Sequence, residues 1–145
     1  EYIQEALIRQ MKTKEFVKEY IAVLEGNLDN TNGTINAPIA RKDGSIIERC
    51  ISPDGEVAIT HYELIKNYAN YCTVKFLLET GRTHQIRVHC KHIGHSIIGD
   101  TLYGSASELI NRQALHSYRV SFVHPITHNI VEYICNIPDD MLCLA

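Results

Sequence analysis

The sequence lacks the features that mark membrane, secreted and disulfide-stabilised proteins. No apolar run approaches the roughly 20 residues that a helix needs to cross a bilayer. The first residues, Glu-Tyr-Ile-Gln, do not form the basic segment of a secretory signal peptide. The five cysteines are odd in number and never spaced Cys-x-x-Cys, which argues against a disulfide framework and a thiolate zinc site. We therefore expect a protein of the reducing cytoplasm with no membrane partner.

Acidic residues are absent between Gly81 and Gly99, although the whole chain has a formal charge of −3. The same stretch gathers cations and histidines: Arg82, His84, Arg87, His89, Lys91, His92 and His95. A basic segment in an otherwise acidic chain suits an anionic partner better than an ordinary solvated surface does. The segment is therefore the first candidate for a functional site.

The apolar pattern predicts one α+β domain, and 145 residues suffice for a real core. Apolar side chains recur at helical spacing over residues 2–12, whereas residues 29–38 are typical of a loop. β-rich segments predict strands over residues 18–24, 57–64 and 71–79, and two more between 115 and 138 with a turn near 127–129. Two Asp-Gly turns, at residues 43–44 and 54–55, favour hairpins. We predict a mainly antiparallel, mixed sheet with short peripheral helices.

The acid-free segment itself contains a predicted helix over residues 84–93. Thr83 is the expected N-cap, and Gly94 is the expected left-handed residue after the helix. The inward face of this helix is formed by Ile86, Cys90 and Ile93. Arg87 and Lys91 lie one turn apart on an adjoining face.

Arg87 and Tyr20 each allow two interpretations on their residue types alone. A guanidinium among apolar neighbours needs an anion, which is either an acid of the same chain or a carboxylate of an active site. A tyrosine in the middle of a strand is either part of the sheet packing or a platform for a base. Arg82 and Lys91 are either solvated charges or phosphate contacts.

The four histidines fit a metal site poorly. His89 and His92 share a helix face, but His84 and His95 lie near opposite ends of the helix. No carboxylate lies between them to orient a ring or complete a ligand set. We expect no metal, and we expect these histidines to cap, pack or form hydrogen bonds.

Several segments resemble the RluA-like pseudouridine synthases. Residues 81–89 read Gly-Arg-Thr-His-Gln-Ile-Arg-Val-His, which is the signature of that family. The Lys18-x-Tyr20 segment resembles a second family motif. Gly94-His95-Ser96-Ile97-Ile98-Gly99-Asp100 continues the signature, with Ser96 where the family usually has proline. The resemblance extends over almost the whole chain and implies part of a pseudouridine synthase fold.

The resemblance also implies a function and roles for residues. The family isomerises uridine in RNA to pseudouridine without a cofactor, after the target nucleotide is flipped out of its stack. Tyr20 corresponds to the tyrosine that stacks on the uracil, and Arg87 corresponds to the partner of the catalytic aspartate. The expected RNA contacts are Arg82, Thr83, His84, Gln85 and Lys91. RNA, with ribosomal RNA foremost, is the expected partner.

One family motif has no counterpart here. The His-Arg-Leu-Asp motif that holds the nucleophile precedes the Lys-x-Tyr motif in the family, whereas residues 1–17 contain no aspartate and the first is Asp29. We therefore expect residues 1–145 to be the C-terminal portion of one catalytic domain, inactive without the upstream aspartate. Two rivals are a non-catalytic RNA-binding module and a histidine-metal hydrolase.

Overall fold

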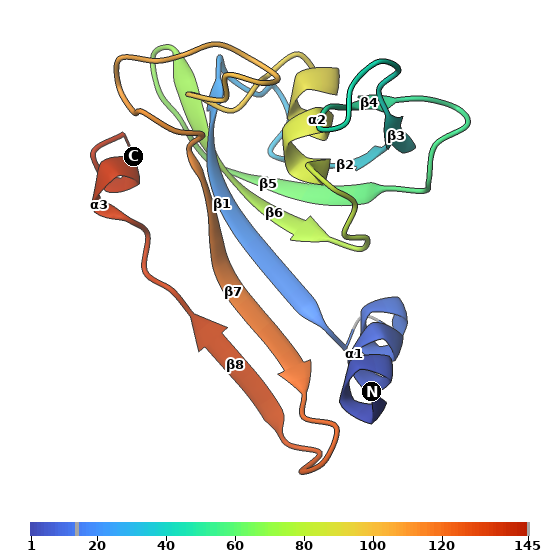
Figure 1. Cartoon of the computed structure of the whole chain (residues 1–145). Coiled ribbons are helices and arrows are strands. Elements are labelled where there is room, and N and C mark those ends of the chain that lie inside the picture. The colour runs from blue at the N-terminus through green and yellow to red at the C-terminus, as the bar shows by residue number, and fades with distance from the viewer. Residues whose placement is uncertain (14, 145) are drawn as a thin grey trace.

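The structure is a computed structural model that describes residues 1–13 and 15–144 (Figure 1). Within these described residues, three helices and eight strands follow one another: α1 (Tyr2–Thr13), β1 (Val17–Glu25), β2 (Asn32–Asn36), β3 (Ile39–Arg41), β4 (Arg49–Ile51), β5 (Ile59–Asn67), β6 (Tyr71–Leu78), α2 (Gln85–His92), β7 (Leu115–Val123), β8 (Ile130–Ile134) and α3 (Asp139–Leu142). Among the described residues, no helix is long and apolar enough to span a membrane.

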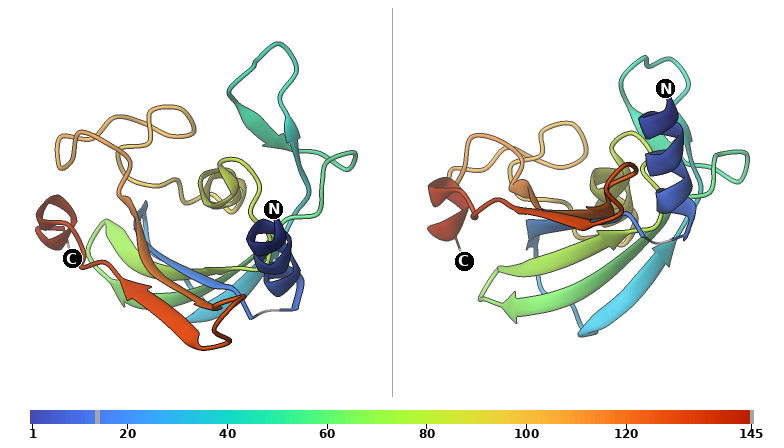
Figure 2. Two further views of the ribbon diagram at one scale, coloured as in Figure 1. Left: turned by 60° about the horizontal axis from the view of Figure 1, so that its bottom comes forward. Right: turned by 90° about the horizontal axis from the view of Figure 1, so that it is seen from below.

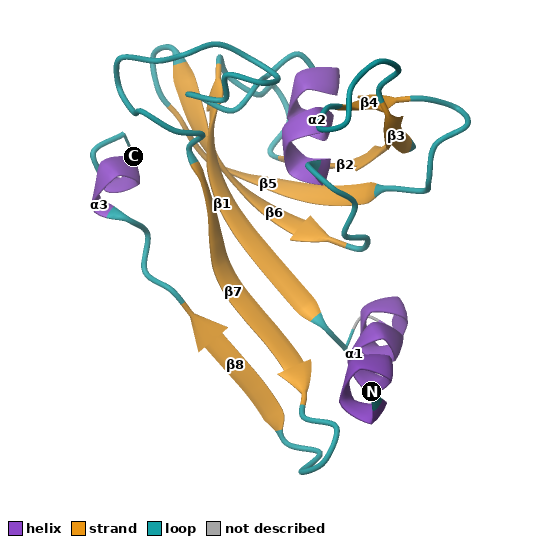
Figure 3. Cartoon of the chain, viewed as in Figure 1, coloured by secondary structure: helices purple, strands orange, loops and turns teal. Residues whose placement is uncertain are grey.

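Six of the strands form one sheet in the order β2-β5-β6-β1-β7-β8 (Figure 3). Every pairing between neighbours in this sheet is antiparallel. The short strands β3 and β4 form a separate antiparallel hairpin. The predicted α+β fold with a mainly antiparallel sheet is confirmed.

The prediction of a loop over residues 29–38 is wrong, because β2 lies within it. Three of its five residues, two asparagines and a glycine, belong to types that are depleted in strands. Strand β5 supplies the hydrogen-bonding partners, and Gly33 packs directly against the Tyr62 ring of that strand. A Cβ atom at Gly33 would lie 2.6 Å from that ring, so a larger residue would require the ring to move.

Helix α2 lies on one face of the curved sheet (Figure 2). Its side chains Ile86 and Cys90 enter the main core together with residues of the central strands, such as Leu24 and Phe76. Met141 of α3 joins the same cluster, so the last helix is tied to the core. The first residue of α2, Gln85, is hydrogen-bonded to Ile59 and Thr60 of β5, which holds the start of the helix against that strand.

Five charged side chains form a ladder across the sheet: Glu63 of β5, Lys75 of β6, Glu19 of β1, Arg119 of β7 and Glu132 of β8. The signs alternate along the ladder, and each neighbouring pair is within 3.9 Å. The closest contact is 2.7 Å, from the Arg119 Nε to a Glu19 carboxylate oxygen. The Arg119 hydrogen bond outweighs partial burial and lowers the pKa of Glu19. Opposite charges facing each other across strands stabilise their pairing.

We expect Arg119→Met to destabilise the fold by about 1–3 kcal/mol at neutral pH, because it leaves the Glu19 carboxylate, 12 % exposed, without its main donor. A carboxyl whose folded pKa is lowered adds stability above its unfolded pKa and loses it as the pH falls through the folded pKa. The difference between wild type and variant should therefore shrink toward about pH 3. Urea unfolding, followed by circular dichroism at neutral pH and at about pH 3, measures the free energy of unfolding of wild type and variant.

Lys42→Met is the matched control, because Lys42 pairs with Glu48 at 2.7 Å on the surface of the β3–β4 hairpin. It should leave stability unchanged within error. An Arg119→Met effect that is equal at both pH values would contradict the assignment.

Candidate active site

Helix α2 begins at an unusual residue. The predicted N-cap at Thr83 is wrong: His84 is the N-cap, with a left-handed backbone (φ 56°, ψ 23°) and no side-chain capping bond. The predicted left-handed Gly94 after the helix is confirmed, with φ 83°. The turn before the helix is closed instead by the side chain of Gln85.

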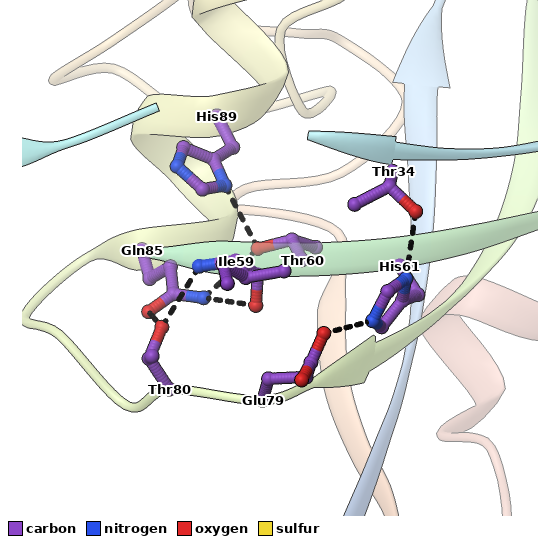
Figure 4. A network of polar contacts seen from close by, with 8 residues as sticks. All are labelled: Thr34, Ile59, Thr60, His61, Glu79, Thr80, Gln85 and His89. Atoms are coloured by element: carbon purple, nitrogen blue, oxygen red, sulfur yellow. Dashed lines mark hydrogen bonds and ion pairs between the residues drawn. The ribbon is translucent and has the colours of Figure 1, made fainter. Parts of the chain in front are cut away.

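The Gln85 amide holds this turn against the sheet (Figure 4). Its oxygen accepts hydrogen bonds from the Thr80 hydroxyl (2.7 Å) and the Arg82 backbone N–H (3.0 Å). Its nitrogen donates to the Ile59 carbonyl (3.1 Å) and the Thr60 hydroxyl (2.9 Å) of β5. Because both donor hydrogens and two acceptor positions are engaged within the chain, Gln85 positions the residues around it.

The buried His89 of α2 extends this hydrogen-bond network, because it contacts the same Thr60 hydroxyl as Gln85 does (Figure 4). The Thr60 hydroxyl, which accepts from Gln85, donates its own hydrogen to the His89 Nδ1 (2.8 Å). The His89 Nε2 then donates to the Ala37 carbonyl (2.9 Å). Burial lowers the pKa of His89, which keeps the ring neutral. Within residues 1–13 and 15–144, no group of three or more His, Cys, Asp or Glu side chains is arranged to hold a metal.

Arg87 forms an ion pair with Asp100 of the same chain. Its Nε and Nη2 donate to the two carboxylate oxygens of Asp100, each at 2.8 Å. The Asp100 side chain is fully buried, and that of Arg87 is 14 % exposed. The internal ion pair is thus one of the two alternatives that the sequence leaves open, and its geometry is bidentate.

Asp100 is held ionised by donors from three residues. Burial alone would raise the pKa of Asp100, but Arg87 and the backbone N–H groups of Tyr103 and Leu102 outweigh it and lower the pKa. The same ion pair raises the pKa of Arg87. The Arg87 guanidinium also lies over the Tyr103 ring, 5.0 Å from its centroid.

A cleft of about 250 Å³ brings together residues that are far apart in the sequence. It is lined by residues of β1, β6, the turn before α2, α2 itself and the start of β7 with the segment before it: Tyr20, Leu78, Arg82, His84, Gln85, Ile86, Arg87, Gln113 and Leu115. Tyr20 and Arg87, predicted from separate motifs, therefore share one cleft. Arg82, His84 and Gln85 of the predicted RNA contacts line it too.

Tyr20 lies where the pairing of β1 with β7 is irregular. The register shifts between Glu19 and Tyr20, so that Tyr20 faces Ser117. Such bulges re-aim a side chain and are frequent next to active sites. Partial burial raises the pKa of Tyr20, opposed by a hydrogen bond with Ser117, so the phenol remains protonated at neutral pH.

The other predicted RNA contacts lie outside this cleft. Thr83 lines a neighbouring groove of about 410 Å³ between the 81–83 turn and the β3–β4 hairpin. Arg82 lines both, and its guanidinium bonds the Val57 carbonyl (2.8 Å) and the exposed Glu56 (3.1 Å). Lys91 lines a third depression, one turn further along α2.

Asp100 and Tyr103 were not predicted as site residues. Both belong to the Gly-Asp-x-Leu-Tyr-Gly segment that continues the signature, but their residue types assign them no role. One signal was available for Asp100: it is the acid that ends the acid-free stretch. Asp100 is thus the anion that the mostly buried Arg87 needs.

Comparisons with known proteins agree with this geometry. The family model for RNA pseudouridylate synthase matches residues 2–92. An uncharacterized RNA pseudouridine synthase of Bacillus subtilis, YjbO, is 46 % identical over 124 residues, and the match covers 86 % of this chain and 44 % of that protein. The ribosomal large subunit pseudouridine synthase D of Haemophilus influenzae is 38 % identical over 153 residues, which cover 96 % of this chain and 47 % of that protein. The chain thus spans about half the length of these relatives.

Solved structures show the same fold. Human RNA pseudouridylate synthase domain containing 1 superposes with a TM-score of 0.77 at 25 % identity, over 91 % of this chain and 59 % of that chain. Human RNA pseudouridylate synthase domain containing 4 superposes with a TM-score of 0.71 at 19 % identity, over 95 % and 64 %.

We expect Asp100→Asn to destabilise the fold by about 3 kcal/mol, because it leaves the mostly buried Arg87 guanidinium without its counter-charge. Asp140→Asn is the matched control: Asp140 also pairs with an arginine, Arg112, at 2.9 Å, but both side chains are about 40 % exposed. The control should cost less than about 1 kcal/mol. Chemical denaturation at neutral pH compares the two, and equal losses would contradict the importance of the buried pair.

Proposed function

Since the chain belongs to the RNA pseudouridylate synthase family, we propose that it is part of an enzyme that isomerises uridine in RNA to pseudouridine. The names of relatives such as the ribosomal large subunit pseudouridine synthase D support ribosomal RNA as the substrate and the cytoplasm as the location. The reaction breaks the C1′–N1 bond and joins C5 to C1′, while a proton leaves C5 and N1 gains one. Because no electrons are gained or lost overall, the reaction needs no redox cofactor, and the proposal includes no cofactor and no metal.

The observation that carries the proposal is the cleft shared by Tyr20 and Arg87. Asp100 engages the Nε and Nη2 of Arg87, and Nη1 has no hydrogen-bond partner among the described residues. A guanidinium has five N–H donors in a fixed plane, so one held on one edge still offers donors to a second carboxylate. In the proposal that second carboxylate is the catalytic aspartate.

Tyr20 is proposed to stack on the flipped uracil. Flipping costs a few kcal/mol of lost stacking, which an aromatic face in the pocket partly restores. The Tyr20 ring is suited to this because the strand and the contact with Ser117 limit its orientation. A fixed ring loses little conformational entropy when the base binds.

The proposed RNA contacts divide into two kinds. Arg82 and Lys91 supply positive charge for phosphates on either side of the target nucleotide. Thr83 and His84 offer uncharged hydrogen-bond donors close to the proposed position of the RNA. Gln85 is engaged within the chain, so we propose that it contributes by holding Arg82 in place.

The nucleophilic aspartate is proposed to lie outside residues 1–145. In the family it precedes the Lys-x-Tyr motif, and no aspartate precedes Lys18 in this sequence. Residues 1–145 would then form the C-terminal portion of one catalytic domain. They would supply the stacking tyrosine and the arginine to a carboxylate from the preceding portion.

Tritium release from ribosomal RNA labelled at C5 of uridine tests the function. We expect the complete protein to release tritium and residues 1–145 alone to release none above a no-protein blank, because the carboxylate that starts the reaction is absent. Release by residues 1–145 alone would overturn the placement of the nucleophile. If the complete protein binds RNA but never releases tritium, the non-catalytic RNA-binding module is correct instead.

In the complete protein, Arg87→Met should lower kcat by about a hundredfold or more, equivalent to about 3 kcal/mol. Without Arg87 the catalytic carboxylate loses its counter-charge, so its pKa rises and the nucleophilic form is lost. Arg87→Lys should restore activity only partly, because lysine keeps the charge but not the planar fork. Steady-state kinetics on labelled RNA measure these effects.

Two further variants control this experiment. Arg87→Met combined with Asp100→Asn removes both buried charges, so that a folded but inactive double variant separates catalysis from stability. Arg82→Met removes a contact made in both ground and transition states, so it should raise KM more than it lowers kcat. A near-normal kcat for Arg87→Met would disprove its pairing with the catalytic aspartate.

A further inference from the structure

His84 is held in the cleft at an energetic cost. Its backbone is left-handed, with φ 56°, and among the described residues His128 alone of the other non-glycine residues has a positive φ. Strained backbones persist where the surrounding contacts enforce them, and they cluster at functional sites. Here the contact is with Tyr103: the His84 Nδ1 lies 2.7 Å from the Tyr103 hydroxyl, and the two rings meet edge to face.

The hydrogen bonds of Tyr103 determine which nitrogen of His84 carries the proton. The Tyr103 hydroxyl is buried and accepts a hydrogen bond from the Arg49 backbone N–H (2.9 Å). Its own hydrogen needs an acceptor, and among the described residues the His84 Nδ1 is the acceptor within reach. Nδ1 therefore accepts, and in the neutral ring the proton is on Nε2.

The surroundings of His84 keep this ring neutral. Burial and the guanidinium groups of Arg87 and Arg49 lower the pKa of His84 and outweigh the opposing effect of the Asp100 carboxylate. A second proton would also have to bind Nδ1, which would leave the Tyr103 hydroxyl without an acceptor. The result is a fixed, uncharged N–H donor in the same cleft as Tyr20.

We propose that the Nε2–H of His84 donates a hydrogen bond to the O4 carbonyl oxygen of the target uracil and so selects uracil against cytosine. The inference rests on the proposed function and assigns a specificity role within it. Arg82 and Arg87 already supply charge to this cleft, so a neutral donor adds little for a phosphate. It does distinguish the O4 acceptor of uracil from the N4 amino donor of cytosine, because a donor facing a donor is unpaired.

Histidine NMR tests the inference without any need for turnover. In the complete protein labelled with ¹⁵N-histidine, we expect His84 to be the neutral Nε2–H tautomer at neutral pH. Tyr103→Phe should release it into a mixture of tautomers. RNA with uridine at the target position should shift the Nε2 and its proton, and the same RNA with cytidine should not. A Nδ1–H tautomer, a cationic ring or equal shifts with both RNAs would overturn the proposal.

Kinetics with thio-substituted RNA identify the bonded atom. Sulfur is a poor hydrogen-bond acceptor, so wild type should turn over uridine roughly tenfold faster, in kcat/KM, than 4-thiouridine, whereas 2-thiouridine, which keeps the O4 oxygen, should not show this loss. His84→Phe keeps the ring edge on Tyr103 but has no N–H, so it should lower kcat/KM for uridine roughly tenfold and remove that preference. His84→Gly relieves the backbone strain and should give the same result if the phenylalanine variant does not fold.

His92→Phe is the matched control, because His92 is on the same helix but exposed and outside the cleft. It should leave uridine turnover and the thio preference unchanged. A His84→Phe enzyme that keeps the wild-type preference would overturn the proposal. If His84→Phe instead removed a preference for phosphate over phosphorothioate at the target nucleotide, the proposal would also be overturned, because the partner of His84 would then be a phosphate. Absence of turnover by wild type on every RNA would disprove the proposed function, while the NMR result would still decide the state of His84.

Discussion

The buried ion pair between Arg87 and Asp100 is the interaction on which the cleft depends. A guanidinium and a carboxylate can be withdrawn from water together only when each satisfies the other with good geometry. Here two parallel hydrogen bonds join helix α2 to the segment that follows it. The same carboxylate accepts from the Tyr103 backbone N–H, and the Tyr103 hydroxyl in turn contacts His84. One buried charge thus orients three side chains from two segments.

A second, uncharged network fixes the same helix to the sheet. The Gln85 amide and the His89 imidazole both meet the Thr60 hydroxyl of β5. The helix is thereby anchored at its first turn and again one turn later. Because such a network is fully satisfied, it specifies one position of the helix and one orientation of the turn before it. The charged pair can then present Arg87 to the cleft from a rigid support.

Much of the fold could be predicted from local sequence, because most strands consist of β-branched and aromatic residues between turn signals. The signature segment likewise predicted α2 and its left-handed glycine. Strand β2 could not be predicted, since its pairing is supplied by β5 rather than by its own residues. The cap at Thr83 was missed because Gln85, a residue inside the helix, closes the turn. The Arg87–Asp100 pair depends on a contact across 13 positions, which residue types do not reveal. The roles of Tyr20 and Arg87 remain predictions.

The ladder of alternating charges across the sheet has a consequence for the cleft on its other side. Successive side chains of a strand point to opposite faces of the sheet. Glu19 therefore lies on the face of the charge ladder, and Tyr20 lies on the opposite face. A slip of β1 by one residue would turn the tyrosine outward and bring a carboxylate into the cleft. Glu19 pairs with both Lys75 and Arg119. These ion pairs favour the register of β1 that keeps the Tyr20 ring in the cleft. Ion pairs on one face of the sheet thereby determine which side chains reach the cleft on the other face.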